Sequence, residues 1–409
     1  MIKGPSSASL LLSEDCNLAC KYCFELGKRN RKHMTEEVAV KAVDFLYQNA
    51  IEDEGGSVGY TMFGGEPLLK TNILNKVVEQ SLKMRDKTNI PFAFTIITNG
   101  TIMTDEVYNS LRWYNKNNIP YNLQLSVDGI REYHDINRVT RSNRGSFDII
   151  EGNVERFKEA VGSIKNINVH GALNKETLPG MYEGYKYFTE AWGIPATWFM
   201  PINGNFWDEK DVEIYEQQLT LIANDILRKM EETKNFIYLE DYAPLNKALS
   251  PKSPPHTPCG AGKNYCVITA AGDTHPCHQF YFDEPGEDSR TGNIWDGIKP
   301  KKNRLFENYS AEDMYCSIDR DCQNTDCYRC IASFYANTGT ILATEYGPRC
   351  DMMTIDDKIT NEFRKILAEK KFDSTGLEEK PIGCPHLERY EHTNFDEIFK
   401  KYAEAEETF

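Results

Sequence analysis

Three cysteines lie close together near the start of the chain, in the stretch SEDCNLACKYCFE at residues 13–25. Cys16, Cys20 and Cys23 could supply three thiolates from one tight loop, whereas closed zinc sites and most iron–sulfur clusters take four protein ligands. A cubane cluster held by three thiolates keeps one iron open for a substrate or a cofactor. The alternatives are a zinc site completed by a distant residue such as His33, and thiols with no shared role.

The charge and composition of the whole chain limit its partners. The 409 residues carry a formal net charge of −15, which repels phosphates, so we expect no nucleic-acid partner. The chain has no run of about eighteen apolar residues and no signal peptide, so we expect no membrane span and a cytoplasmic location. In that reducing compartment, twelve cysteines favour metal or redox chemistry over disulfides.

A basic segment, GKRNRKH at residues 27–33, follows the three cysteines. One interpretation is a solvated loop. The other is a cationic rim that attracts an acidic partner. We hypothesise that an acidic peptide docks there through Lys28, Arg29, Arg31 and Lys32.

Apolar runs alternate with helical patterns over the first two hundred residues. Strands are predicted at 7–13, 57–63, 92–99, 123–128, 166–173 and 196–202. Helices are predicted at 35–50, 104–117, 146–160 and 209–232, with Thr104 and Ser146 as N-caps. Six strand–helix units in series predict a parallel α/β sheet, and apolar strands such as FAFTIIT suit burial on both faces.

Polar and glycine-rich residues follow four of these strands. The three cysteines come after the first strand, GGEP (64–67) after the second, TNGT (98–101) after the third and SVDG (126–129) after the fourth. Parallel barrels and open α/β sheets build their active sites at the carboxyl ends of strands. We therefore expect a composite site with a metal motif at this edge.

The motif CNLACKYC, followed by GGEP after the next strand, resembles the radical S-adenosylmethionine (SAM) enzymes. In that family three cysteines hold a 4Fe–4S cluster, whose open iron binds the amino and carboxylate groups of SAM. The reduced cluster cleaves SAM to methionine and a 5′-deoxyadenosyl radical, which abstracts a hydrogen atom. The resemblance covers residues 7 to about 202 and implies that Cys16, Cys20 and Cys23 are cluster ligands.

The same resemblance implies which residues contact SAM. Tyr22 stands where an aromatic residue supports the adenine, and GGEP stands where the methionine ammonium is received. Ribose and carboxylate contacts are implied near the end of the fourth strand. The expected cofactor-binding residues are Tyr22, Gly64, Gly65, Glu66, Pro67, Asn99, Ser126, Asp128 and Arg138.

A second group of cysteines begins at Cys259 and resembles the SPASM extension, which holds auxiliary 4Fe–4S clusters. The resemblance rests on a cysteine about twelve residues before GDTHPC and on GNIWDG after it, although the later spacing departs from the usual pattern. In chain order, the first auxiliary cluster would take Cys259, Cys266, Cys277 and Cys330, and the second would take Cys316, Cys322, Cys327 and Cys350. If Cys266 is not a ligand, the first cluster keeps an open iron. Cys384 has no counterpart and is either a free thiol, a ligand or a redox group.

These resemblances imply a domain order and a set of cofactors. We expect a partial (β/α)6 TIM-like barrel at 1–235, a linker at 236–258, a small SPASM domain at 259–390 and a C-terminal helix at 391–409. The expected cofactors are SAM and three 4Fe–4S clusters, one of which binds SAM. The alternative for the second region is a zinc-ribbon-like domain with two tetrahedral zincs.

Most SPASM enzymes modify peptides or proteins. Sulfatase-activating relatives carry an aspartate base directly after the cysteine of Gly-x-x-x-x-Cys, where this chain has His278, which could accept a proton or serve only as a hydrogen-bonding group. PCHQF followed by GNIWDG resembles maturases of the sactipeptide and ranthipeptide groups, which form thioether cross-links. Many relatives have an N-terminal leader-binding domain. Because this chain starts at its first strand, we expect that domain to be absent or supplied separately.

We therefore expect a radical SAM oxidoreductase that forms a thioether in a ribosomal precursor peptide. An external one-electron reductant of the flavodoxin or ferredoxin type would supply the electron. The competing reactions are carbon–carbon cross-linking and formylglycine formation. A non-enzymatic iron–sulfur electron-transfer protein is the alternative from another class, but such a carrier has no need for an amino-acid-binding segment such as GGEP at its cluster.

Overall fold

The structure is a computed structural model. The residues that it describes are 4–27, 31–53, 56–204, 206–233, 242, 245, 259–282, 286–299, 306, 315–316, 330–339, 341, 343–344 and 347–369. The predicted C-terminal helix at 391–409 lies outside them, as do Lys28, Arg29, Cys322, Cys327 and Cys384. No helix within the described ranges is long and apolar enough to cross a membrane.

Six parallel strands form the centre of the fold. They are β1 (Ser7–Ser13), β2 (Val58–Gly64), β3 (Phe92–Thr98), β4 (Tyr121–Ser126), β5 (Ile167–Leu173) and β6 (Thr197–Pro201). Each strand pairs with the next in chain order. Every bound lies within two residues of the predicted one. The predicted α/β architecture with a parallel sheet is confirmed.

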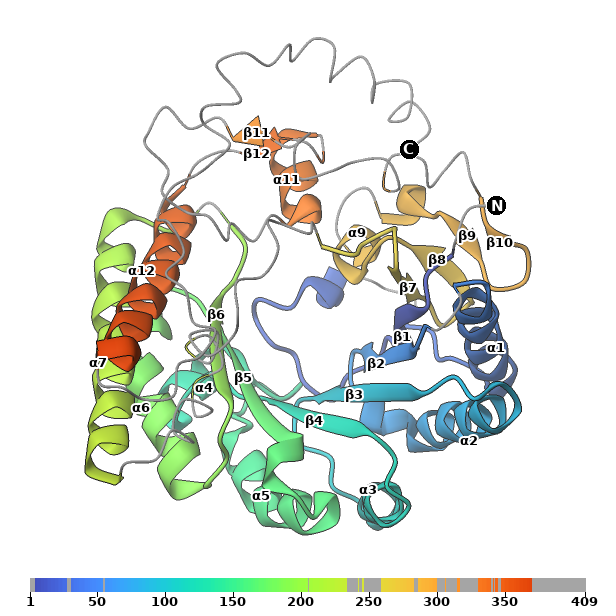
Figure 1. The fold of residues 1–409 in the computed structure, drawn as a ribbon, viewed down its shortest axis with the longest axis horizontal. Helices are drawn as coiled ribbons and strands as arrows, with labels where there is room; N and C mark the ends of the chain where they lie inside the picture. Colours follow the sequence, from blue (N-terminus) through green and yellow to red (C-terminus); the bar gives the residue numbers. More distant parts are fainter. Residues whose placement is uncertain are drawn as a thin grey trace.

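Helices connect the parallel strands and cover the outer face of the sheet (Figure 1). They are α1 (Glu36–Glu52), α2 (Thr71–Thr88), α3 (Asp105–Lys116), α4 (Arg131–Asn137), α5 (Phe147–Val161), α6 (Met181–Lys186) and α7 (Glu209–Thr233). Thr104 caps α3 as predicted, because its side chain accepts from Val107 N at 3.3 Å. Ser146 stands at the N-cap position of α5 as predicted, but its side chain makes no capping bond, because its hydroxyl bonds His134 and the Arg138 carbonyl instead.

Side chains of the parallel strands differ in burial between the two faces. β2 and β5 alternate buried and half-buried residues, and β6 alternates buried and exposed ones. The prediction of burial on both faces therefore fails for these strands, because helices cover only one face of a half-open barrel. Trp198 and Met200 of β6 stay 37% and 39% exposed on the uncovered face.

The second cysteine-rich region extends the same sheet rather than starting a new one. Its strands are β7 (Tyr265–Ile268), β8 (Asp273–His275), β9 (Gly292–Asn293) and β10 (Gly297–Ile298). β7 pairs in parallel with β1, and the full order is β10-β9-β8-β7-β1-β2-β3-β4-β5-β6 (Figure 1). Of the predicted linker 236–258 the structure describes only Tyr242 and Leu245, and both are buried in the main core.

Four shorter elements and one long helix complete the described chain. They are α9 (His278–Phe282), β11 (Tyr315–Cys316), β12 (Ala343–Thr344), α11 (Ile331–Thr338) and α12 (Pro348–Glu369). α12 packs along α7, where Tyr215 Oη donates to Asp356 Oδ1 at 2.6 Å (Figure 1).

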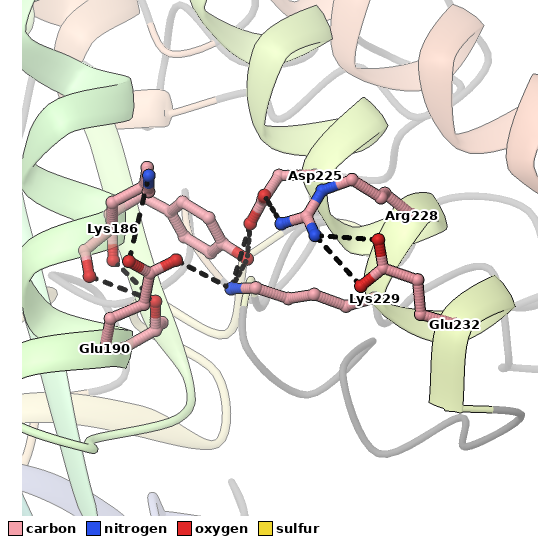
Figure 2. A network of polar contacts seen from close by, with 8 residues as sticks. Lys186, Glu190, Asp225, Arg228, Lys229 and Glu232 are labelled. Carbon is pink, nitrogen blue, oxygen red and sulfur yellow. Dashed lines mark hydrogen bonds and ion pairs between the residues drawn. The ribbon is translucent and has the colours of Figure 1, made fainter.

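A network of charged side chains ties α7 to the chain that leads into β6 (Figure 2). Lys229 Nζ on α7 lies 2.9 Å from Asp225 Oδ2 and 3.5 Å from Glu190 Oε1. Arg228 joins the same Asp225 through its other oxygen at 2.7 Å. Since Asp225 is only 6% exposed, these contacts hold a buried carboxylate with two cations. The network fixes the outer wall of the barrel at its last strand.

Candidate active site

The loop that leaves β1 carries the three cysteines. Main-chain hydrogen bonds anchor it to the turn after α4, because Ala19 N donates to Val139 O at 2.7 Å and Lys21 N donates to Asn137 O at 3.0 Å. All three thiols are partly buried. The structure thus brings the predicted cluster ligands together on one short, anchored loop at the carboxyl edge of the sheet.

The two glycines of GGEP let the end of β2 lie against this loop. Gly65 N donates to Ser13 O at 2.7 Å. A side-chain carbon at Gly64 would lie 2.1 Å from Ser13 O, and one at Gly65 would lie 2.4 Å from Asp15 O and 3.0 Å from Cys16 N. Gly64 also has a φ of +112°, which other residues rarely adopt. The cysteine loop can therefore approach β2 only because both positions lack a side chain.

Glu66 is fully buried beside the cysteine loop. Its Oε1 accepts from Leu68 N at 3.0 Å and from Thr98 Oγ1 at 2.8 Å, and its Oε2 accepts from Asn99 N at 2.7 Å. Burial raises the pKa of Glu66 to about 7, although these hydrogen bonds oppose the shift. A carboxylate offers about four acceptor positions, so the group retains capacity for a cationic donor.

Asn99 links the end of β3 to the cysteine loop. Its Nδ2 donates to Asn17 Oδ1 at 2.9 Å and lies 3.6 Å from Cys16 Sγ. Asn17 in turn donates to Thr101 Oγ1 at 2.7 Å. Neither Asn17 nor Thr101 was among the predicted site residues. The signal that could have found them is their position, because one lies inside the cysteine motif and the other in TNGT.

Asp128 joins the cysteine loop to β4 and β5. Tyr22 Oη donates to its Oδ2 at 2.5 Å, while Arg138 Nε and Ala172 N each donate to its Oδ1 at 2.9 Å. Burial alone would lower the pKa of Arg138, but Asp128 and Tyr22 raise it above the ordinary value, so the guanidinium stays charged. The Arg138 guanidinium also lies 5.5 Å from the centre of the Tyr22 ring.

The structure places the remaining predicted residues of the first region as follows. Ser126 ends β4 and is 8% exposed. His33 is exposed, and its Nδ1 lies 3.1 Å from Ser13 Oγ. Arg31 of the basic segment pairs with Asp15 at 2.5 Å. This arginine therefore already has a charge partner within the chain.

Burial is the main influence on the pKa values of the three thiols in the first loop. It raises the pKa of Cys16 to about 12 and that of Cys23 to about 11, and it raises that of Cys20 as well. Cysteines bind iron as thiolates, so cluster assembly must release their protons. Throughout the described chain, no three His, Cys, Asp or Glu side chains are arranged to hold a single metal ion. A cubane takes one thiolate per iron, so its ligands need not meet at one point.

The second group of cysteines divides by environment. Cys277 and Cys330 pack against a small apolar cluster that includes Phe280 and Phe306. Burial raises the pKa of Cys277 to about 12, and Cys330 and then Cys259 add to the shift, so these thiols lie close enough to interact. Cys350 is partly buried on α12, and Cys316 ends β11.

Cys266 lies apart from that group. It sits on β7 opposite Ala8 of β1, is 2% exposed and packs in the main hydrophobic core. Burial raises the pKa of its thiol, and no other cysteine in the described part of the chain contributes to that shift.

His278 begins α9 directly after Cys277 and contacts two rings of the first region. Its ring centroid lies 5.8 Å from that of Phe24 and 5.0 Å from that of Phe63. Within the described residues its Nδ1 is buried and has no hydrogen-bond partner. Phe24 follows Cys23, and Phe63 precedes Gly64, so this histidine packs between the two motifs of the site.

The sequence profile of the radical SAM superfamily matches residues 10–183. These residues are a radical SAM domain. The matched span contains the cysteine loop, GGEP, Asn99 and the Asp128 cluster, so SAM and one 4Fe–4S cluster are its cofactors.

Three sequence relatives of the chain are an uncharacterized protein, a sulfatase-maturating enzyme and a cyclopropyl synthase. An uncharacterized protein of Methanocaldococcus jannaschii is 29% identical over 204 residues, which are 49% of this chain and 63% of that protein. A cysteine-type anaerobic sulfatase-maturating enzyme of Clostridium novyi is 25% identical over 68% of this chain and 75% of its own. The radical SAM cyclopropyl synthase TigE of Paramaledivibacter caminithermalis is 24% identical, over 41% of this chain and 35% of its own.

Solved structures share the fold of this chain well beyond the matched domain. Native anSMEcpe with bound AdoMet superposes with a TM-score of 0.69 at 20% identity, covering 89% of this chain and 99% of the other. Streptococcus suis SuiB bound to its precursor peptide SuiA has a TM-score of 0.52 at 14% identity, covering 85% and 76%. At these identities the likeness concerns the fold.

Proposed function

We propose that the protein is a radical SAM maturase that joins a cysteine of a ribosomally made peptide to a carbon of an acceptor residue through a thioether. Cys16, Cys20 and Cys23 would hold the SAM-binding cluster. Glu66 would accept the methionine ammonium, and Asn99 and the Asp128–Arg138 pair would hold the loop against the cofactor. When bound, SAM and its cluster supply the hydrogen-abstracting radical, and an auxiliary cluster accepts the electron left over when the carbon–sulfur bond forms.

One observation carries the thioether proposal: the division of the second cysteine group. Cys277 and Cys330 pack against the same small apolar cluster, and Cys330 and Cys259 both raise the pKa of Cys277, whereas Cys266 packs in the main core on β7. A first auxiliary cluster built on those three thiolates would lack a fourth from Cys266. A substrate cysteine could then complete it as a thiolate, which needs no separate base at the moment of bond formation. The second auxiliary cluster, through Cys316, Cys322, Cys327 and Cys350, remains part of the proposal.

A peptide substrate is supported by two of the structural neighbours. SuiB has been solved with its precursor peptide SuiA, and anSMEcpe has been solved with AdoMet and the Cp18Cys peptide. In this chain, Trp198 and Met200 leave apolar surface exposed on the uncovered face of β6. That face could receive the side chains of an extended peptide near the carboxyl edge of the sheet.

Formylglycine formation is the second candidate, and the sequence similarity to the Clostridium novyi sulfatase-maturating enzyme over 68% of this chain favours it. The residue after Cys277 speaks against it. That residue is His278, whose ring packs against Phe24 and Phe63 and whose Nδ1 is buried. A carboxylate base is therefore absent from the position that the sulfatase resemblance assigns to it.

The test is to react the reconstituted protein, under anaerobic conditions with SAM and dithionite, with cysteine-containing precursor peptides encoded near its gene. A thioether product loses two hydrogen atoms and its cysteine no longer reacts with iodoacetamide. A second reaction would use a peptide with a sulfatase consensus cysteine. Conversion of that peptide to an aldehyde, with the precursor peptides unchanged, would replace the thioether proposal by formylglycine formation.

A further inference from the structure

Five exposed cationic side chains surround the cysteine loop, on a chain whose net charge is −15. We call this set the basic collar, and its members are Lys21, Arg31, Lys32, Arg141 and Arg144. Lys21 lies between two of the predicted cluster ligands. Two members precede α1 and two lie on the turn between α4 and α5.

Contacts within the chain bring the collar together on one surface. Asp15, beside Cys16, pairs with both Arg31 and Arg141, so a single carboxylate joins the two segments. Main-chain hydrogen bonds anchor the cysteine loop to the end of α4 and the residues that follow it, so Lys21 lies next to the turn that carries Arg141 and Arg144. Glu14, the neighbouring acid, is 5% exposed and accepts from Tyr281 Oη at 2.7 Å. The five cations outnumber the two neighbouring carboxylates, Glu14 and Asp15, so the collar keeps a net positive charge.

The positive surface attracts a negatively charged partner, and the acidic remainder of the protein repels it. Such steering raises association rates by about 10- to 1,000-fold at low ionic strength. Complexes that transfer electrons are characteristically small, short-lived and charge-guided. The collar suits an encounter of that kind, because its members and their neighbours Ser142 and Asn143 are charged or polar. Peptide recognition would instead call for apolar pockets or a free strand edge.

We propose that the basic collar is the docking surface for an acidic one-electron carrier protein that reduces the SAM-binding cluster. This proposal rests on the proposed function, because only a cluster at the three cysteines needs an electron for each cleavage of SAM. The carrier loses one electron and the cluster gains it, with no other bond made or broken. Lys21 lies on the loop that would hold the cluster and the other four members flank that loop, so a docked carrier is brought to the part of the surface next to the cluster.

The test compares two double variants of the whole reconstituted protein. Lys32→Glu with Arg144→Glu reverses two collar charges that lie outside the cluster and SAM contacts. Lys83→Glu with Lys87→Glu makes the same change in net charge on exposed residues of α2. Cluster reduction by an acidic flavodoxin hydroquinone is followed by stopped-flow absorbance and by electron paramagnetic resonance.

We expect the collar variant to be reduced about tenfold more slowly than the α2 variant at low salt. The difference should disappear at about 0.5 M salt, and reduction by dithionite should be equal in both. Equal slowing in the two variants, or none in either, would overturn the proposal. Normal reduction with lost affinity for the precursor peptide would assign the collar to the peptide instead. Failure of dithionite-driven SAM cleavage in the unmodified protein would refute the proposed function, whereas the docking result is measured separately as cluster reduction.

Discussion

The Tyr22 hydroxyl donates a hydrogen bond of 2.5 Å to Asp128 Oδ2, which joins the cysteine loop to the end of β4. Residues 106 positions apart in the sequence thereby set the position of the predicted ligand Cys23 relative to the sheet. The same carboxylate accepts from Arg138 and from the main chain of β5. The attachment of the cysteine loop to the sheet therefore depends on the buried Asp128 carboxylate, which accepts from several donors.

Removing the charge of Asp128 should destabilise the protein more than removing the Tyr22 hydroxyl. Asp128→Ala leaves the buried Arg138 cation without its partner and should cost about 3–5 kcal/mol of unfolding free energy. Tyr22→Phe loses one hydrogen bond to a charged group and should cost about 1.5–3 kcal/mol. Denaturant unfolding of the protein measures both.

The control for this pair is Tyr108→Phe, which removes a solvent-accessible hydroxyl of a half-buried tyrosine that donates to Glu159 and accepts from Arg112, both exposed. It should change the unfolding free energy by less than about 0.5 kcal/mol. If Asp128→Ala were no more costly than this control, the Asp128–Arg138 pair would not anchor the loop.

Gly65→Ala should abolish iron binding at the first site while Gly152→Ala leaves it intact. The alanine at 65 would lie 2.4 Å from Asp15 O and would push the cysteine loop away from β2. Gly152 lies within α5, and a side chain there meets nothing within 4 Å. Helix propensity should make the second variant more stable by about 0.5–1 kcal/mol.

Iron content and the charge-transfer absorbance after reconstitution report the outcome. The assay is best made on a background in which the auxiliary cysteines are replaced, so that only the first site contributes. A Gly65→Ala protein with full iron would show that the close approach of β2 to the loop is dispensable.

The affinity for SAM should rise as the pH rises through about 7. Burial raises the pKa of Glu66 to about 7, so the group is protonated below that pH and ionised above it. Only the ionised form is a pure acceptor for the methionine ammonium, whereas the protonated form presents a hydroxyl donor. Equilibrium dialysis of SAM against reconstituted protein between about pH 6 and about pH 8 measures the change.

Glu66→Gln should bind SAM more weakly, by about tenfold, and should lose the pH dependence in this range. The NH₂ group of the glutamine would also face at least one of the three donors that now bond to the Glu66 carboxylate, so at least one of those hydrogen bonds would be lost. A glutamine variant with the same pH profile as the unmodified protein would assign the titration to another group.

The sequence predicted the parallel sheet closely because the strands are rich in apolar residues and four of them are followed by glycine or polar residues. Those endings also located the site, since parallel strands bring their carboxyl ends to one edge. The burial pattern was less predictable. FAFTIIT looks apolar on both faces, yet β3 alternates buried and more exposed residues, because the helices cover only the outer side.

Long-range pairing accounts for what the sequence did not reveal. The pairing of β7 with β1 joins residues more than 250 positions apart, and no local pattern encodes it. Ser146 has the residue type of an N-cap, but tertiary contacts with His134 and Arg138 use its hydroxyl, while Asp135 Oδ1 accepts from the first amides of α5. The spacing of the cysteines could not distinguish Cys266 from the cysteines around it, because a cysteine on a buried strand and a metal-binding cysteine in a loop look the same in the sequence.

Cys266→Ala should keep the full iron content of the reconstituted protein, whereas Cys277→Ala should lose about four irons. The reason is position. Cys266 is buried in the main hydrophobic core, and truncating it should cost only about 1 kcal/mol of stability through the small cavity it leaves. Cys277 instead interacts with Cys330 and Cys259. Iron analysis and Mössbauer spectroscopy of the two variants, each compared with the unmodified protein, provide the measurement. Loss of iron from Cys266→Ala would make this thiol a ligand and would close the coordination site that the thioether proposal leaves for the substrate cysteine.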